Sequence, residues 1–289
     1  MAGLLSPDRS VEVRASPIHG LGLFAAEAIP SATIIFTDAP LLTVDINVAL
    51  EKDPAFVARP DVAALMDALL SISDEHGDDK PDDAYPSGAA AAIDGIKALR
   101  VADLFAALPV PGAATAWALA DAWASPDKTA AGILRTNALH DDGGVDRLFA
   151  RVARINHACG DASNATWAFV TLPDGVRVCG VVAARPIAAG AEILLSYGRG
   201  GGAGSAEAAE ARRARLARDY NFECGCATCA GGAPPANDAS MRAAVERGSA
   251  AARTATPDAL RDPPKRESVV DRLSKPRAVA EDDRPWLKK

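Results

Sequence analysis

The stretch Tyr220-Asn-Phe-Glu-Cys-Gly-Cys-Ala-Thr-Cys229 places three of the chain's five cysteines, Cys224, Cys226 and Cys229, within six positions. Thiols so close in sequence cannot all pair with one another, but the spacing Cys-x-Cys-x2-Cys can wrap three sulfurs around one tetrahedral Zn²⁺. A closed structural site takes four ligands, and the candidates for the fourth are Cys159, Cys179 and the histidines. An odd cysteine count with this clustering does not fit a secreted disulfide framework. We therefore expect a structural zinc ion and an intracellular, reducing environment.

The composition is that of a globular chain with an acidic balance. Hydrophobic residues make up 49% and charged residues 24% of the 289 positions, which excludes wholesale disorder. The net charge of −7 argues against sequence-independent binding to the phosphates of DNA or RNA, so we expect no direct nucleic-acid binding. Proline, glycine and aspartate interrupt the most apolar window, residues 106–124, so no membrane span is expected. The start of the chain has an acid and a proline where a secretory signal needs an apolar run, which predicts a protein that is not secreted.

The first half of the chain divides into a strand-rich part and a helical part. Alternating and β-branched runs within residues 10–50 predict short strands. From residue 51 to residue 134, Ala, Leu and Met recur at three- and four-residue spacing, which predicts a helical insert. Its expected helices cover 62–70, 89–108 and 113–124. The Asp- and Pro-rich residues 71–88 predict a loop between the first two helices.

Strands return in the second half of the chain. Two β-rich runs, residues 164–172 and 175–183, flank Pro173-Asp174-Gly175 and predict a hairpin. A short final strand is expected at 192–197. Beyond it the sequence predicts a glycine-rich link and a helix, at 198–204 and 206–220. Few large apolar residues follow, so the tail 231–289 is expected to be disordered.

Two further motifs contain residues that could carry chemistry. In Arg154-Ile-Asn156-His157-Ala-Cys159 a histidine lies near a cysteine, as in a cysteine nucleophile with its base. No orienting carboxylate follows, so a structural histidine and a zinc-ligand cysteine fit the motif better. In His19-Gly20-Leu21-Gly22-Leu23-Phe24 two glycines allow a tight turn and close approach of the backbone to a ligand. The alternative is an ordinary turn, because the longer dinucleotide-binding pattern is not completed.

Taken in this order, the motifs resemble those of the SET-domain protein lysine methyltransferases. The resemblance lies in the glycine turn at 20–24, Asn156-His157-Ala-Cys159, Glu192-Ile-Leu-Leu-Ser-Tyr197 and the cysteine segment 220–229. The helical insert and the closing Phe-x-Cys-x-Cys-x2-Cys look most like the branch that also carries a MYND zinc finger. Residues 38–130 contain no cysteine, so the MYND finger itself is missing.

The resemblance implies a mostly β SET-domain fold of small sheets with an α insert, a pseudoknot-like C-terminal segment and a post-SET zinc site. The parts of this fold are expected at residues 10–50 for the N-terminal SET part, 51–134 for the helical insert, 135–222 for the C-terminal SET part and 223–230 for the post-SET zinc segment.

The resemblance also implies a set of site residues. Tyr197 is the expected catalytic residue, at the point where a lysine channel meets the methyl group, and Phe222 is expected to stack on adenine. The expected contacts of S-adenosylmethionine are Gly20, Leu21, Gly22, Asn137, Asn156, His157 and Phe222. Cys159 is expected to complete the structural Zn²⁺ site with Cys224, Cys226 and Cys229. Cys179 is then left as a thiol of the core.

The implied function is S-adenosylmethionine-dependent methylation of a lysine ε-amine in a histone or another protein. A monomer in the nucleus or the cytoplasm is expected, with a lysine-containing protein or a histone tail as its partner. The stretch Cys159-Gly-Asp-Ala-Ser-Asn164 departs from the Cys-x-Pro-Asn of the family. That departure keeps an alternative open, a SET-like, zinc-stabilised interaction module with weak or no turnover.

Overall fold

A computed structural model describes residues 11–75, 87–141, 144–173, 175–197 and 209–230. The chain divides into two compact units. The first unit includes the described residues up to Thr43, the segment Leu108–Leu139 and the described residues from Arg147 onward. The second unit consists of Val44–Ala107 and His140–Asp146, again where described. The predicted tail 231–289 and the glycine-rich link 198–204 lie outside the described residues.

The strands form small sheets. Two sheets have two strands, in the orders β1-β2 and β10-β7, and two have three strands, in the orders β3-β9-β8 and β4-β6-β5. The strands are β1 (Val11–Ala15), β2 (Leu21–Ala25), β3 (Ile34–Asp38), β4 (Pro40–Val44), β5 (Leu139–His140), β6 (Asp146–Phe149), β7 (Asn156–His157), β8 (Ala165–Thr171), β9 (Arg177–Ala183) and β10 (Leu194–Leu195). The β10-β7 pair is parallel, and the pairs β1-β2, β3-β9 and β8-β9 are antiparallel.

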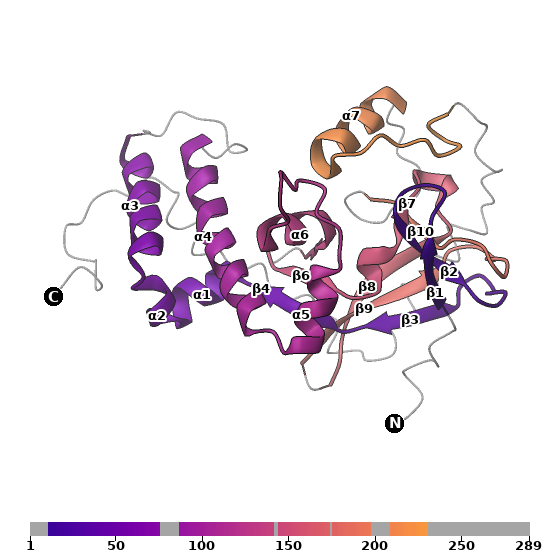
Figure 1. Cartoon of the computed structure of the whole chain (residues 1–289), viewed down its shortest axis with the longest axis horizontal. Helices are drawn as coiled ribbons and strands as arrows, with labels where there is room; N and C mark the ends of the chain where they lie inside the picture. The colour runs from indigo at the N-terminus through magenta and orange to yellow at the C-terminus, as the bar shows by residue number, and fades with distance from the viewer. Residues whose placement is uncertain (1–10, 76–86, 142–143, 174, 198–208, 231–289) are drawn as a thin grey trace. The chain divides into compact units, whose positions relative to one another are not determined.

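The predicted hairpin forms the centre of the first unit (Figure 1). β8 and β9 pair in register from Ala165 opposite Ala183 to Thr171 opposite Arg177, and β3 adds to the other edge of β9. β9 is the central strand of this sheet and is buried along most of its length. The fully buried Cys179 packs in this core with Phe36 and Val181, so it is a core thiol as expected.

The helices of the first unit are short. They are α5 (Val110–Trp117), α6 (Ala130–Asn137) and α7 (Ala209–Tyr220), with the 3-10 turns η1 (Val152–Arg154) and η2 (Gly160–Ala162). α6 begins where the Thr129 side chain accepts a hydrogen bond from the Gly132 N–H. α5 ends at Trp117, seven residues before the end predicted from periodicity. Beyond it, the Asp121 carboxylate accepts from the N–H groups of Trp123 and Thr129, which fixes a loop instead of a further helical turn.

The second unit is helical. Its helices are α1 (Ile46–Lys52), α2 (Pro54–Val57), α3 (Pro60–Glu75) and α4 (Ser87–Ala107). Asp45 and Asp53 accept N-cap hydrogen bonds at the starts of α1 and α2. α3 and α4 pack side by side (Figure 1). A Cβ at Gly95 of α4 would lie 3.0 Å from the Leu65 side chain, so the two helices approach closely here.

Two sequence predictions need correction. The loop predicted over 71–88 is too long, because α3 continues to Glu75 and α4 starts at Ser87; residues 76–86 lie outside the described part. The description of the fold as mostly β does not hold either, since the helices contain more of the described residues than the strands do. The long helices α3 and α4 account for most of that excess.

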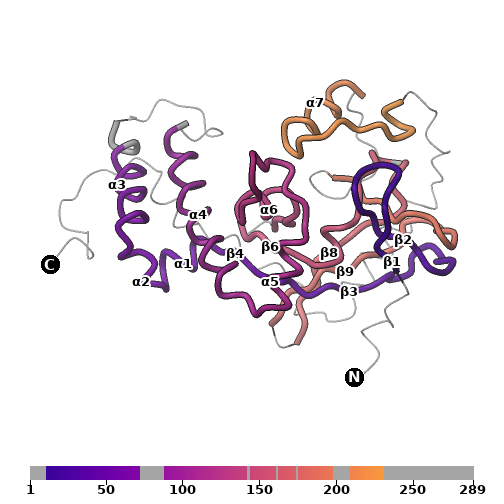
Figure 2. The backbone as a smooth tube through the Cα atoms, in the orientation of Figure 1, coloured from indigo at the N-terminus to yellow at the C-terminus, as the bar shows by residue number. Residues whose placement is uncertain are grey.

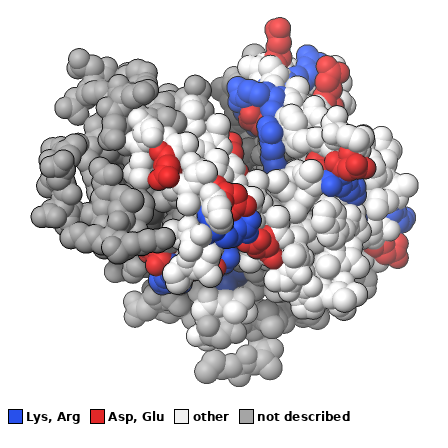
Figure 3. Space-filling model, turned by 60° about the vertical axis from the view of Figure 1, so that its left-hand side comes forward, with Lys and Arg blue, Asp and Glu red and all other residues white. Residues whose placement is uncertain are grey.

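Charges of both signs lie intermixed on the face drawn in Figure 3. Ion pairs near the surface include Arg218–Asp219 in the first unit and Arg59–Asp61 in the second. Such exposed pairs stabilise a fold by only about 0–1 kcal/mol each. Among the described helices, none is both long and apolar enough to cross a membrane.

Candidate active site and metal centre

Four cysteines from distant parts of the chain come together in the first unit. The Sγ atoms of Cys159, Cys224, Cys226 and Cys229 all lie within 4.8 Å of one another. Cys159 Sγ is 3.7 Å from Cys224 Sγ and 3.4 Å from Cys229 Sγ, and none of these thiols is in a disulfide. Zn–S bonds of about 2.3 Å in a tetrahedron place sulfurs about 3.8 Å apart. The cluster therefore has the donor type, the number and the spacing of a structural zinc site.

The electrostatics of the cluster also suit a cation. Burial raises the pKa of the Cys159 thiol well above its ordinary value and that of Cys224 to about 11. Burial acts in the same direction on Cys226, but the backbone N–H groups of Cys159 and Cys229 outweigh it and lower its pKa to about 7. Cys159 and Cys224 therefore resist ionisation without a cation, whereas a divalent metal stabilises their thiolates.

The cluster connects the C-terminal segment to the strand β7. Cys159 lies two residues after the end of β7, and the side chain of Thr228 donates to the Cys159 carbonyl at 3.3 Å. Leu216 of α7 is fully buried against the thiols, and Tyr197 and Phe222 pack on the same cluster. The cysteines thus fix the residues after α7 next to Asn156 and His157.

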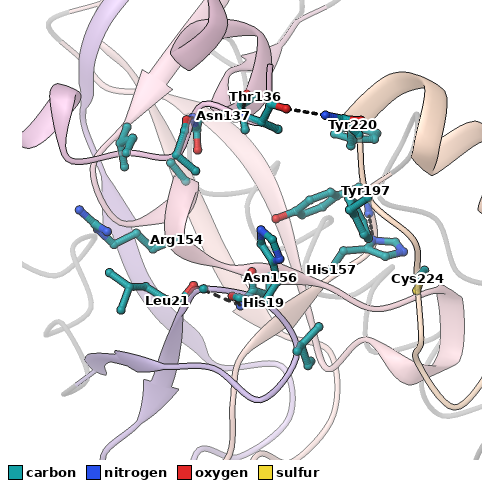
Figure 4. Close-up of a pocket in the computed structure, with 18 of the residues that line it drawn as sticks. His19, Leu21, Thr136, Asn137, Arg154, Asn156, His157, Tyr197, Tyr220 and Cys224 are labelled. Carbon is teal, nitrogen blue, oxygen red and sulfur yellow. Dashed lines mark hydrogen bonds between the residues drawn. The ribbon is translucent and has the colours of Figure 1, made fainter. Parts of the chain in front are cut away.

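His157 is a buried link between the thiols and Tyr197. Its Nε2 lies 3.1 Å from Cys159 Sγ, and its Nδ1 accepts a hydrogen bond from the Tyr197 N–H at 2.7 Å (Figure 4). Burial, with a smaller contribution from the Arg215 charge, lowers the pKa of His157 to about 4. A neutral imidazole with both nitrogens engaged is a structural histidine. The contact with Cys159 does not create a nucleophile, because the same burial holds the thiol protonated.

The glycine turn is held by side-chain hydrogen bonds. Gly20 has φ +51°, a conformation that favours glycine. The Ser16 hydroxyl accepts from the Ile18 N–H, and the Asn156 amide donates to the carbonyls of His19 and Leu21 at 3.1 and 3.2 Å (Figure 4). Asn156 therefore shapes the turn with the same amide that was expected to contact the cofactor.

Gly22 is needed for a different reason. Its backbone lies against Glu192, and a Cβ at this position would overlap the Glu192 carboxylate. That carboxylate accepts from the Asn156 amide at 2.8 Å and from the Ser16 hydroxyl at 3.0 Å. Glu192 thus joins the two residues that hold the glycine turn, a role that the sequence analysis missed.

Tyr197 lies in an aromatic group beside these residues. Its ring centroid is 5.0 Å from that of His157 and 5.2 Å from that of Tyr220, and Phe222 lies edge-on to it at 6.2 Å. Its hydroxyl donates to the Ile155 carbonyl at 2.5 Å. Burial raises the pKa of this hydroxyl well above its ordinary value, so Tyr197 stays a protonated donor at every physiological pH.

A cavity of about 700 Å³ opens between the glycine turn, β7 and the C-terminal segment. Figure 2 shows two of the segments that line it, the indigo turn and the orange segment after α7, on the same side of the view. Of the predicted residues, those that line the cavity are Gly20, Leu21, Asn137, Asn156, His157, Tyr197, Phe222, Cys224 and Cys226. A volume of this size is typical of pockets for small organic ligands and cofactors.

Asn137 lines the cavity, but its amide is engaged elsewhere. Its Nδ2 donates to the carbonyls of Ala120 and Ile133, both at 2.7 Å. The sequence analysis assigned residues 118–122 to a helix, whereas they form a non-helical wall of the cavity. Arg154 also lines the cavity and brings a positive charge to its edge (Figure 4). The sequence analysis did not predict Arg154 as a site residue, although its position two residues before Asn156 could have indicated that it lies near the cavity.

Residues 20–198 match the family model of the SET domain, which is more than half of the chain. The chain therefore belongs to the SET-domain family, and its small sheets and helices are a SET-domain fold. The match does not assign the chain to a branch of the family, so the likeness to the SET-and-MYND branch stays a prediction. No match was found among curated proteins.

Solved structures give distant similarities. One is a Plasmodium falciparum protein provisionally named a histone methyltransferase, with 14% identity, a TM-score of 0.31 and coverage of 66% of this chain and 95% of that one. Another is the SET domain of LSMT bound to lysine and AdoHcy, with 14% identity and a TM-score of 0.40. A third is Rubisco LSMT bound to AdoMet, with 15% identity and a TM-score of 0.35. For each of these two, the match covers 77% of this chain and 54% of the other, about half of its length. Similarities this distant carry no functional argument.

Proposed function

We propose that this chain is an S-adenosylmethionine-dependent protein-lysine N-methyltransferase, acting on a histone or another protein. The observation that carries the proposal is that one cavity collects the glycine turn, Asn156, Tyr197 and Phe222. These residues come from both ends of the described chain and from its middle. An interaction surface would have no need to gather them around a cavity of cofactor size.

The residues around the cavity suit the binding of a sulfonium cofactor. The glycine turn gives the cofactor access to backbone atoms, and Arg154 offers a cation for a carboxylate. The Phe222 ring offers a face for an adenine. S-adenosylmethionine, when bound, supplies an electrophilic methyl group carried on sulfur.

Tyr197 is the proposed catalytic residue. A free lysine has a pKa of about 10.4, so the amine must lose its proton before it can act as a nucleophile. An apolar, aromatic surrounding such as that of Tyr197 and Phe222 favours the neutral amine. The Tyr197 hydroxyl is fixed by its bond to the Ile155 carbonyl, and its free lone pair can orient the amine and accept weak C–H···O bonds. Positioning of this kind supplies much of the rate in an in-line displacement.

The proposed zinc ion is structural. Four cysteine ligands close its coordination shell, so no position is left for a substrate or a water. Its role is to fix Phe222 and Tyr220 at the cavity, because these residues lie two and four positions before Cys224. The remaining alternative is the zinc-stabilised interaction module. The observation in its favour is the stretch Cys159–Asn164, which departs from the Cys-x-Pro-Asn of the family. The Asn164 amide at its end donates to the Glu192 carbonyl and accepts from the Leu194 N–H.

The experiment is a calorimetric titration of zinc-replete protein with S-adenosylmethionine, beside Asn156→Ala. Saturable binding that is lost in the variant supports the proposal. Transfer of labelled methyl to lysine in a mixture of histones and other proteins then tests turnover. A folded, zinc-loaded protein that binds no S-adenosylmethionine would contradict the enzyme and favour the interaction module.

A further inference from the structure

The non-helical wall of the cavity, Ala118–Ala122, is held in place by side chains from two other segments. On one side, α6 supplies Thr136, whose hydroxyl accepts from the Ala122 N–H at 3.0 Å, and Asn137, whose amide donates to the Ala120 carbonyl. Both bonds come from residues close in sequence to the wall. They fix the wall to α6 but not to the C-terminal segment, which lines the cavity from the other side.

Asn221 supplies the contact on that other side. It follows the last residue of α7 and has φ +56°, a left-handed conformation that asparagine tolerates better than most residues. Its N–H donates to the Ala217 carbonyl, which ends the helix. Its side-chain Nδ2 donates to the Ala122 carbonyl at 2.5 Å. Because a carbonyl can only accept, the amide nitrogen must face Ala122.

The bond joins two walls that approach the cavity from different directions. In Figure 4, Thr136 and Asn137 lie toward the upper left, Tyr220 lies at the upper right, and His19 and Leu21 lie below. Ala122, Tyr220, Asn221 and Phe222 all line the cavity. The hydrogen bond from Asn221 to Ala122 therefore links two walls of the cavity.

We propose that Asn221 is a positioning residue that ties the Ala118–Ala122 wall to the segment after α7 and so retains the cofactor in the cavity. The part that concerns the cofactor rests on the proposed function. Asn221 acts through the two walls and not on the reacting atoms. Its loss should therefore raise the Kd and the KM for S-adenosylmethionine and leave kcat at saturating cofactor unchanged.

Two variants separate the amide from the backbone conformation. Asn221→Gly keeps the left-handed conformation at no steric cost but removes the amide. Asn221→Asp keeps the shape but cannot donate to a carbonyl. Ala32→Gly is the matched control, because Ala32 also has a positive φ, +57°, and does not line the cavity. It reports the effect of glycine at such a position alone.

The measurements are calorimetric titration with S-adenosylmethionine and amide hydrogen exchange of the full, zinc-replete chain. Both Asn221 variants should bind about fivefold more weakly, the loss expected for one net hydrogen bond. Both should also exchange faster over Ala118–Trp123, with or without the cofactor. Ala32→Gly should match the wild type in both measurements.

The outcomes distinguish the tie from the proposed function. Wild-type exchange over Ala118–Trp123 in both Asn221 variants would overturn the tie, and so would full cofactor affinity in Asn221→Gly. The wild type could also bind no S-adenosylmethionine while both Asn221 variants exchange faster over Ala118–Trp123. That result would support the hydrogen-bonded link between the walls and contradict the proposed cofactor. A purely backbone role would leave Asn221→Gly like the wild type.

Discussion

The two units hold their chain with different kinds of interaction. In the first unit, single polar side chains hold irregular backbone, as the Asn156 amide does for the turn at Leu21. In the second unit, α3 and α4 pack through apolar residues such as Leu69 and Ala92, and ion pairs such as Arg59–Asp103 lie near the surface. A regular helix satisfies its own backbone, whereas a turn or a loop must find partners elsewhere. Loss of one polar atom should therefore have a larger local effect in the first unit than in the second.

Metal removal is the sharpest test of this difference. Chelation, or Cys224→Ser, should release the segment after α7 and abolish binding of S-adenosylmethionine, because Phe222 and Tyr220 then lose their fixed position. Structural zinc sites contribute about 10–16 kcal/mol of apparent binding free energy, more than any single contact in the second unit. Metal content, hydrogen exchange over residues 220–230 and the titration measure the effect.

Cys179→Ala is the control for metal removal. Cys179 is buried in β9 and lies outside the thiol cluster, so this variant should keep one zinc ion per chain. Unchanged affinity for S-adenosylmethionine in the metal-free protein would contradict the structural role of the cluster.

Tyr197→Phe should have the next largest effect, on rate and not on folding. The variant keeps the ring contacts with His157 and Tyr220 but loses the hydroxyl that donates to Ile155. We expect methyl transfer to fall about a hundredfold or more, as for other groups that act in the transition state. The free energy of unfolding should fall by only about 1 kcal/mol. Turnover like that of the wild type would remove Tyr197 from the catalytic role.

Alanine at two glycines compares the units directly. At Gly22 a Cβ would overlap the Glu192 carboxylate, which is itself bonded to Asn156 and Ser16. Gly22→Ala should therefore destabilise the first unit by about 1–3 kcal/mol and weaken cofactor binding. At Gly95 the nearest atoms are the end of the flexible Leu65 side chain, and alanine favours a helix by about 1 kcal/mol over glycine.

Gly95→Ala should accordingly be close to neutral. Urea denaturation of both variants measures the contrast. An equal decrease in the free energy of unfolding for both variants would show that the Glu192 side chain and its hydrogen-bond partners can move aside as easily as the Leu65 side chain.

Asn156→Ala should have a smaller effect on stability than Gly22→Ala. The carbonyls of His19 and Leu21 lie near solvent and can bond to water instead, so about 1 kcal/mol is expected. Binding of S-adenosylmethionine should fall at least tenfold, because the turn loses its shape. Asn164→Ala is the comparison: this buried amide holds β10 and lies outside the cavity lining. Greater destabilisation in Asn164→Ala together with weaker cofactor binding in Asn156→Ala is the expected pattern.

The sequence predicted the parts of the fold that depend on neighbours in the chain. The turn residues Pro173-Asp174-Gly175 indicated the β8-β9 hairpin, and the spacing of Cys224, Cys226 and Cys229 indicated that these thiols lie together. The resemblance to a known family added Cys159, which the structure places in the cluster.

Contacts between distant residues were not predictable in the same way. The end of α5 depends on the Asp121 carboxylate, and the direction of the Asn137 amide depends on the Ala120 carbonyl. Glu192 reads as an ordinary strand residue until Gly22 and Asn156 are placed beside it. The folded backbone determines which polar group bonds to which carbonyl. The periodicity of apolar residues in the sequence does not predict these partners.

The smallest expected effect is a pH dependence in the second unit. The Asp146 carboxylate lies 2.8 Å from His140 Nδ1 and is paired with Lys97. The hydrogen bond to Asp146 raises the pKa of His140. Burial acts to raise the pKa of Asp146, but the bond to His140 and the charge of Lys97 lower it on balance. The His140 contribution is present below its unfolded pKa of about 6.5 and is lost as the pH rises through the folded value.

The Asp146 contribution has the opposite sign, since it is lost only as the pH falls below about 4. Both contributions are therefore complete at about pH 5.5. The His140 side chain is 62% exposed, so solvent reduces its contribution to a few tenths of a kcal/mol. Urea denaturation of the wild type and His140→Gln should show a larger difference at pH 5.5 than at pH 8. The same difference at both pH values would mean that the protonated imidazole adds nothing, and that Lys97 alone neutralises Asp146.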